Sequence, residues 1–344
     1  MATRPPCIWW SRCWRSSRSP TIRRGRRSRR CGPRLRVRCS PYVRGRWCPV
    51  SVDVSCVIIT HDRDDLLREA LASALSQDLH EGVEVVVVDD LGSVTARQVV
   101  EELAEDRYGS SVRYVVSDTE PRGASASRNA GASAARGQVL AFLDDDDLWQ
   151  PSYLSDAVDL LHGSHADFVL TWMTVLERDG SVAPLLRMAR GLTATQCVAR
   201  NRGMTGSNIV ITRSAFELAG GFDASLRVSN DKDLLVRLLL LGLAYEVVER
   251  DNAVHRRHSG PQLTRMDERR AAGLLEYLEK HRGLTSRTDR RFFMRTVHGI
   301  RRRTAPSAPA RLRHLVLYVA NQSMTDVIDR VVRRRRRDGS YRSA

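Results

Sequence analysis

A short apolar run that ends in four consecutive aspartates, QVLAFLDDDD at residues 138–147, is the stretch that best predicts the fold. Its apolar part has the length and composition of a buried strand, and it stops where the acids begin. In open α/β sheets, ligands bind beyond the carboxyl ends of the strands. The sequence therefore predicts both a covered sheet and a polar site at this edge of it.

The chain before this run alternates between strand patterns and helix patterns. Helices are predicted at 64–77, 94–106 and 125–135, and further buried strands at 54–60, 84–88 and 112–116. Strand and helix at this spacing favour an α/β fold with a Rossmann-like, mostly parallel sheet covered by helices.

Acidic residues follow several of the predicted strands. Asp62 comes just after the first strand, Asp89 and Asp90 end the second, and four aspartates at 144–147 end the strand quoted above. Carboxylates that converge repel one another unless a cation lies between them, and hard oxygen ligands suit Mg²⁺ or Mn²⁺. The alternative is that the aspartates form only a solvated turn and a helix cap.

The absence of several known motifs excludes some classes of ligand-binding site. The sequence has no GxxxxGK[ST] motif, which excludes a P-loop NTPase, and no GxGxxG after the first strand, which excludes the dinucleotide fingerprint. An EF-hand loop starting at Asp144 would need glycine where Trp149 stands. An acid at the second strand end instead fits a nucleoside held by its base or ribose.

Six short motifs carry a resemblance to a known family. They are VIITHDR at 57–63, VVDD at 87–90, RGASASRNAG at 122–131, AFLDDDD at 141–147 with Pro151, GGFD at 220–223, and NDKD at 230–233 with Arg237. In order and spacing they resemble those of the family 2 glycosyltransferases, inverting enzymes with the GT-A nucleotide-diphospho-sugar transferase fold. The resemblance covers residues 52–260 and implies a GT-A domain there.

The resemblance also implies a donor site. Asp90 would contact the uracil or thymine edge of the nucleotide, and Thr60 and Arg63 would line the same pocket. Gly123 and Arg128 would belong to the loop and helix start that cover the donor.

Residues 144–146 are similar to the family's DxD motif. Asp146 would bind the metal that bridges the donor diphosphate, while Asp144 or Asp145 would hold ribose or sugar hydroxyls. His258 is a second metal candidate, because similar enzymes often have a basic or His-containing segment there that closes over the diphosphate. A basic surface turn is the alternative for His258.

Asp231 stands where the family has its general base. An acceptor hydroxyl is a poor nucleophile, so a positioned carboxylate must take its proton as it attacks the anomeric carbon. A helix N-cap is the alternative role for Asp231, since an apolar helix follows it. The chain departs from the family pattern at Asn230, where glutamate is common, at His61, where an aromatic residue is common, and at an inserted Leu91.

Both ends of the chain differ in composition from its middle. Residues 1–50 hold fifteen Arg and no acid, so subtracting them from the net charge of +16 leaves +1 for residues 51–344. We expect residues 1–50 to be non-globular. They are either sequence translated upstream of the true start, as the Arg to Lys ratio of 54 to 2 suggests, or a disordered basic arm or transit peptide.

Residues 261–344 are expected to form a helical extension with a basic tail. Helices are predicted at 267–281 and 311–330, followed by five arginines at 333–337. An amphipathic helix with a basic end can lie on anionic lipid. The alternative is a packing helix with a solvated charged tail.

The sequence thus predicts a metal-dependent inverting glycosyltransferase that uses Mg²⁺ or Mn²⁺. Its donor would be a UDP- or dTDP-linked sugar, and its acceptor a sugar, lipid-linked or glycoconjugate hydroxyl in cell-envelope synthesis. A cytoplasmic protein is expected, with peripheral contact at the inner face of the membrane and no nucleic-acid partner. A nucleotidyltransferase of similar fold and a non-catalytic, basic nucleic-acid-binding protein are the alternatives.

Overall fold

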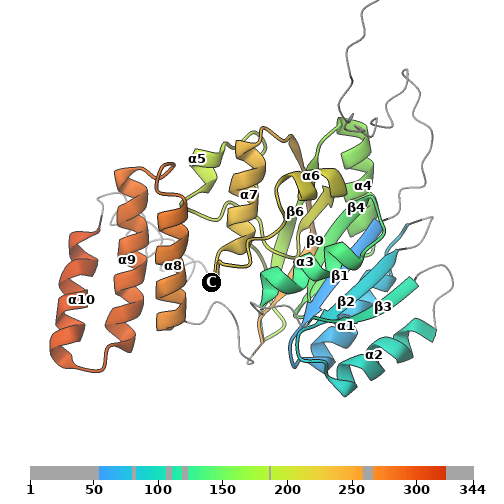
Figure 1. The fold of residues 1–344 in the computed structure, drawn as a ribbon, viewed down its shortest axis with the longest axis horizontal. Helices are drawn as coiled ribbons and strands as arrows, with labels where there is room; N and C mark the ends of the chain where they lie inside the picture. Colours follow the sequence, from blue (N-terminus) through green and yellow to red (C-terminus); the bar gives the residue numbers. More distant parts are fainter. Residues whose placement is uncertain are drawn as a thin grey trace, which may run out of the picture. The chain divides into compact units, whose positions relative to one another are not determined.

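One sheet with helices on both faces dominates the part of the chain that the structure describes (Figure 1). The computed structural model describes residues 54–79, 83–105, 111–117, 123–185, 187–258 and 266–322, which fall within one compact unit. The predicted basic segment at residues 1–50 and the arginines at 333–337 lie outside the described residues.

The first half of the sheet is parallel, as the alternation of strands and helices predicts. Its strands run in the order β3-β2-β1-β4. The elements are β1 (Val54–Thr60), α1 (Asp64–Leu75), β2 (Glu84–Asp89), α2 (Val94–Glu105), β3 (Ser111–Val116), α3 (Ala124–Ala134) and β4 (Val139–Asp144). Each differs from its predicted bounds by at most two residues. The register places Ile59 opposite Asp144 and Thr60 opposite Asp89, so the acidic strand ends meet as expected.

The second half of the sheet mixes directions and was not predicted. It continues from β4 in the order β8-β6-β9-β5, with β7 paired to β6. Within it β6 and β9 run parallel, whereas β4–β8, β6–β8, β6–β7 and β5–β9 are antiparallel. The strands are β5 (Asp147–Trp149), β6 (Phe168–Leu176), β7 (Val182–Pro184), β8 (Ile209–Thr212) and β9 (Tyr245–Arg256).

The core lies on both faces of the sheet, which is why its central strands are almost wholly apolar. On one face, α1, α2 and α4 (Tyr153–Ser164) cover side chains such as Ile58 and Val87. On the other face, Val57 and Phe142 pack under α3, α6 (Arg213–Leu218) and α7 (Asn230–Leu240). The remaining short helix is α5 (Ala194–Cys197).

Three helices follow the sheet: α8 (Glu268–Lys280), α9 (Arg287–Thr304) and α10 (Ala308–Ala320). The first confirms the prediction at 267–281, and α9 was not predicted. The described part of the helix predicted at 311–330 starts earlier and ends at Ala320, and residues 323–330 lie outside the described residues. Among the described helices, none has the length and apolar content that crossing a membrane requires.

Candidate active site

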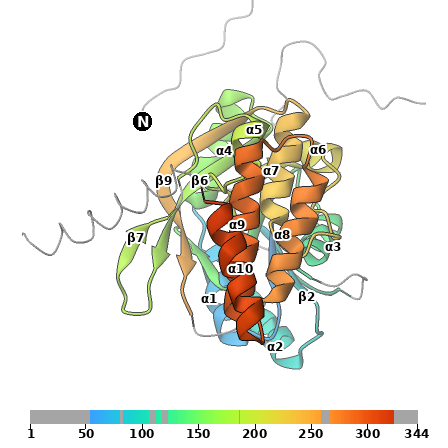
Figure 2. The same ribbon diagram turned by 90° about the vertical axis from the view of Figure 1, so that its left-hand side faces the viewer.

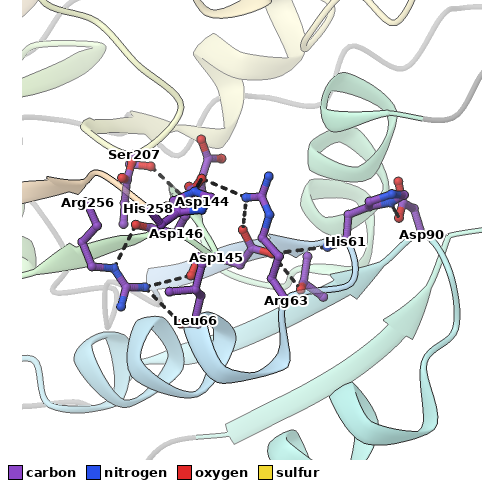
Figure 3. A network of polar contacts seen from close by, with 12 residues as sticks. His61, Arg63, Leu66, Asp90, Asp144, Asp145, Asp146, Ser207, Arg256 and His258 are labelled. Carbon is purple, nitrogen blue, oxygen red and sulfur yellow. Dashed lines mark hydrogen bonds and ion pairs between the residues drawn. The ribbon is translucent and has the colours of Figure 1, made fainter. Parts of the chain in front are cut away.

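The carboxyl ends of β1, β2 and β4 bring together most of the residues that the sequence singles out (Figure 3). Three strands end side by side there, and each is followed by a short polar turn. The four aspartates at 144–147 do not act as one group. They divide between a structural role and a shared carboxylate cluster.

Asp145 turns toward β1 and is buried. Its Oδ2 accepts hydrogen bonds from Thr60 Oγ1 at 2.9 Å and from the His61 backbone N–H at 3.3 Å, while Arg63 Nη1 donates to its Oδ1 at 2.9 Å. Burial raises the pKa of Asp145 to about 6, although the positive charge of Arg63 opposes that rise. Asp145 therefore fixes the segment that leaves β1, and with it Thr60 and Arg63.

Asp144, Asp146 and Asp147 form the carboxylate cluster. One ligand oxygen from each lies within 4.8 Å of the others. Asp146 Oδ2 also lies 2.8 Å from Arg63 Nη1 and 3.0 Å from His258 Nε2. Hard carboxylate oxygens with one imidazole nitrogen fit a divalent cation such as Mg²⁺ or Mn²⁺. The structure places His258 against this cluster rather than on a free basic turn.

Asp147 is the buried member of the cluster. His255 Nδ1 lies 2.8 Å from its Oδ1. Burial raises the pKa of the Asp147 carboxyl, and its hydrogen bond raises the pKa of His255. The pair links β5 to β9, the strand that leads to His258.

Arg256 clamps the turn that presents the cluster, and its role was not predicted. This buried guanidinium donates from Nε to the carbonyl of Asp146 at 2.9 Å and from Nη2 to that of Asp145 at 3.0 Å. Nη2 also reaches the Leu66 carbonyl at 3.1 Å. The sequence shows an arginine between two histidines, but nothing in it indicates that the side chain bonds to backbone across the sheet.

Arg128 holds Asp144 from the other side. Arg128 is buried on α3, pairs with Asp144 Oδ1 and lies over the Phe222 ring, 5.1 Å from its centroid. A side chain at Gly206 would displace the Arg128 guanidinium, because its Cβ would lie 2.1 Å from Arg128 Nη2. Gly123 starts α3 at φ 134°, a conformation that favours glycine.

Asp90 and Asp89 have different surroundings. The His61 ring nitrogen Nδ1 lies 2.6 Å from Asp90 Oδ1 at the exposed edge of the site. Asp89 is fully buried and accepts hydrogen bonds from the backbone of Ser93 and from the Tyr114 hydroxyl at 2.7 and 2.6 Å. Asp89 therefore orders the turn before α2, whereas Asp90 lies beside His61 at the edge of the site.

Asp231 lies in the first turn of α7, as expected, and is partly buried. It is not the helix N-cap, a position taken by Ser229. Burial raises the pKa of Asp231, and the negative charge of Asp144 adds to that effect, while Arg128 partly offsets it. Asn230, where the family pattern has glutamate, donates from Nδ2 to Ser125 Oγ at 2.9 Å and so ties α7 to α3.

The next acid on α7, Asp233, joins this helix to α8 and was not predicted. It is fully buried, and its Oδ1 lies 2.7 Å from Lys280 Nζ and 2.8 Å from His281 Nε2, while Arg237 Nε donates to its Oδ2 at 2.8 Å. Burial alone would raise the pKa of Asp233, but the hydrogen bonds from His281 and Lys280 hold it below its usual range.

Replacement of Asp233 by asparagine is expected to lower the free energy of unfolding near neutral pH by about 3 kcal/mol, because it leaves the partly buried Arg237 without its anion and removes a buried carboxylate that also holds Lys280 and His281. Because the pKa of Asp233 is lowered in the folded protein, the stabilisation is fully present at pH values above the usual aspartate pKa of about 4. It is lost as the pH falls through the lowered pKa. The difference in the free energy of unfolding between Asp233→Asn and the wild type, measured by urea denaturation, should therefore become smaller at acidic pH.

Glu279→Gln on α8 is the matched control, since its pair with Arg282 is exposed and contributes less than about 1 kcal/mol. An Asp233→Asn protein as stable as this control at neutral pH would contradict the structural role of Asp233.

Comparisons with known proteins agree with this geometry. The family model described as Glycosyl transferase family 2 matches residues 55–217, and the one described as Glycosyl transferase family group 2 matches residues 139–325, more than half of the chain. The succinoglycan biosynthesis protein ExoO of Rhizobium meliloti is 28% identical over 306 residues, covering 78% of this chain and 85% of that protein.

Two solved structures share the fold at low sequence identity. Residues 1–349 of S. aureus TarS, in complex with UDP-GlcNAc, align with a TM-score of 0.54 and 17% identity over 77% of this chain and 89% of that one. The mannosyltransferase PcManGT from Pyrobaculum calidifontis, in complex with GDP-Man and Mn²⁺, aligns with a TM-score of 0.53 and 19% identity over 83% and 86%. With the matching family models, these likenesses lead to one conclusion: the chain is a GT-A transferase and belongs to glycosyltransferase family 2.

Proposed function

We propose that this protein is a metal-dependent, inverting glycosyltransferase that moves a sugar from a UDP- or dTDP-linked donor to an acceptor hydroxyl. One observation carries the proposal: two residues at the start of α3 contact both parts of the site, since Arg128 pairs with Asp144 of the carboxylate cluster and Ser125 accepts a hydrogen bond from Asn230, the neighbour of Asp231. A candidate metal site and a candidate base are thereby held beside the same helix start, and transfer from a nucleotide sugar uses both.

The donor end of the site would hold the nucleotide. Asp90, at the end of β2, would accept from the uracil or thymine edge, with Thr60 and Arg63 beside it. Arg128 and the start of α3 at Gly123 would cover the donor. Asp144 would hold ribose or sugar hydroxyls, since the oxygens of Asp145 are turned toward β1. The donors named with the two structural neighbours, UDP-GlcNAc and GDP-Man, support a nucleotide-sugar donor for this chain.

Asp146 would be the principal metal ligand, with His258 beside it. The bound Mg²⁺ or Mn²⁺ would act as a Lewis acid that offsets the charge of the leaving nucleoside diphosphate. The Mn²⁺ named with the mannosyltransferase neighbour supports this assignment. Asp144 and Asp147 would complete the carboxylate environment of the ion.

Asp231 would act on the acceptor. Its carboxylate takes the proton from the acceptor hydroxyl as that oxygen forms the new bond to the anomeric carbon. The bond from that carbon to the phosphate oxygen breaks at the same time, and the nucleoside diphosphate leaves with the electron pair. Attack from the face opposite the leaving group inverts the anomeric configuration.

The acceptor would be a sugar, a lipid-linked sugar or another glycoconjugate of the cell envelope. The name of the ExoO relative, a succinoglycan biosynthesis protein, supports a polysaccharide product. We place the protein in the cytoplasm, in peripheral contact with the inner face of the membrane. The family assignment favours this function over a nucleotidyltransferase or a nucleic-acid-binding protein.

Calorimetry with UDP and dTDP, each with and without Mn²⁺, tests the proposal directly. We expect one of the two nucleotides to bind in the presence of Mn²⁺ and to bind at least about tenfold more weakly without it, because the diphosphate then loses a direct cationic partner. A folded protein that binds neither nucleotide under either condition would require a different donor base or a different activity.

A further inference from the structure

The outer face of α10 is apolar although nothing in the described part of the chain covers it. The helix carries no buried residue. Leu312, Leu315, Val316 and Val319 are 61%, 37%, 59% and 55% exposed. Their spacing of i, i+3, i+4 and i+7 puts all four on one face of the helix. We call these four residues the α10 stripe.

The opposite face of α10 packs against α9. The Tyr318 ring lies against Gly299 of α9, and His314 Nδ1 lies 3.2 Å from His298 Nδ1. Figure 1 shows α10 beside α9, which separates it from α8, and in Figure 2 α10 lies in front of α9. The α10 stripe is therefore not the face through which α10 packs on α9. A helix face that is exposed to water normally carries polar residues instead.

The charge around the α10 stripe identifies what can cover it. Residues 287–320, which form α9 and α10, contain nine arginines and a single acid, Asp289. Arg311 and Arg313 are exposed on α10 itself, next to the stripe. An apolar stripe flanked by arginines matches an anionic lipid surface, where the long arginine stems also favour the interface. A second copy would bring the same positive charges together and is disfavoured.

We propose that the α10 stripe, with Arg311 and Arg313, is a docking surface for an anionic lipid bilayer. The pair between Lys280 of α8 and Asp233 of α7 links the helices that carry this surface to the helix that carries Asp231. The use of the surface to meet a lipid-linked acceptor rests on the proposed function, whereas the lipid contact itself does not.

Co-sedimentation of the full-length protein with vesicles tests the proposal. We expect binding to phosphatidylglycerol–phosphatidylcholine vesicles at low salt and much weaker binding to phosphatidylcholine alone. The double variant Leu312→Ser, Val316→Ser should bind at least about tenfold more weakly, since each buried methylene lost weakens partition about fourfold. Neutralisation of Arg311 and Arg313 to glutamine should weaken binding to the anionic vesicles and reduce its dependence on salt.

Leu218→Ser is the matched control, because Leu218 is 63% exposed on α6, away from the hairpin. It should bind vesicles as the wild type does. Vesicle binding is measured without donor, and Mn²⁺-dependent nucleotide binding is measured separately on each variant, so failure of the docking surface and failure of the proposed function are distinguishable.

Equal vesicle binding by the wild type and the Leu312→Ser, Val316→Ser variant would overturn the proposal and assign any lipid affinity to other basic segments. It would also be overturned if the wild type ignored anionic vesicles and instead formed dimers that the double variant loses, measured by analytical ultracentrifugation.

Discussion

Replacement of Asp231 by asparagine is expected to lower kcat by about 10²–10⁴-fold, the range typical of a positioned general base. Asparagine has nearly the same size as aspartate but cannot accept the acceptor's proton. Asp231 is partly buried, and burial disfavours its charged form, so the neutral amide should leave the fold intact. The rate is measured as nucleoside diphosphate released from the donor sugar that the protein uses.

The pH dependence of kcat distinguishes a base from a merely structural carboxylate. Asp231 must be ionised to act, and burial raises its pKa, so activity should fall with decreasing pH at a value above the usual aspartate pKa of about 4. This acid limb should disappear in Asp231→Asn. Asp159→Asn, at an exposed position on α4, is the control and should keep both the rate and the acid limb.

An Asp231→Asn variant with at least a tenth of the wild-type kcat would remove Asp231 from the base position. Retention of the acid limb in that variant would point to another titrating group. Unchanged donor binding in the same variant, together with a lost rate, would assign Asp231 to the acceptor side of the reaction.

The parallel half of the sheet was predictable because its strands form a simple repeated pattern. The strands β1, β2 and β4 are short apolar runs, and helices connect them in sequence. The second half was not predictable in this way. Apart from the hairpin of β6 and β7, its strands pair with neighbours distant in sequence, and β6 pairs with β9 through a shifted register near Trp172.

Helix α9 was missed although the sequence contains signals for it. Ser286 and Asp289 form a capping box at its start, and Phe293, Val297 and Ile300 are buried on one face. Because the segment contains many arginines, its overall composition is polar and does not reveal this apolar face. The caps therefore carry more information here than composition does.

The sequence predicted which residues belong to the site better than it predicted how they contact one another. Local sequence placed the acids at the strand ends, but it could not show that Asp89 and Asp145 turn inward to hold backbone and side chains while their neighbours turn outward. The clamp by Arg256 and the link through Asp233 join segments far apart in the chain, and a single sequence carries no signal for such contacts.

Replacement of Asp146 by alanine is expected to abolish the Mn²⁺ dependence of nucleotide binding. In the presence of Mn²⁺ the variant should bind UDP or dTDP only as well as the wild type does without Mn²⁺, which is at least about tenfold more weakly. Asp146 differs from Asp145 in its surroundings: its Oδ2 faces His258 and Arg63, whereas Asp145 is bound by Thr60 and the backbone of His61.

This difference gives a matched pair of variants. Asp145→Asn should lower the melting temperature, because the carboxylate that anchors Thr60 and Arg63 is lost, yet it should retain the effect of Mn²⁺ on nucleotide affinity. Asp146→Ala should retain the fold and lose the effect of Mn²⁺. If calorimetry finds the reverse, with Mn²⁺ dependence lost only in Asp145→Asn, the metal site belongs to Asp145 and the division of roles among the four aspartates is wrong. If both variants keep it, Mn²⁺ is held without Asp146, and the assignment of Asp146 as the principal metal ligand is wrong.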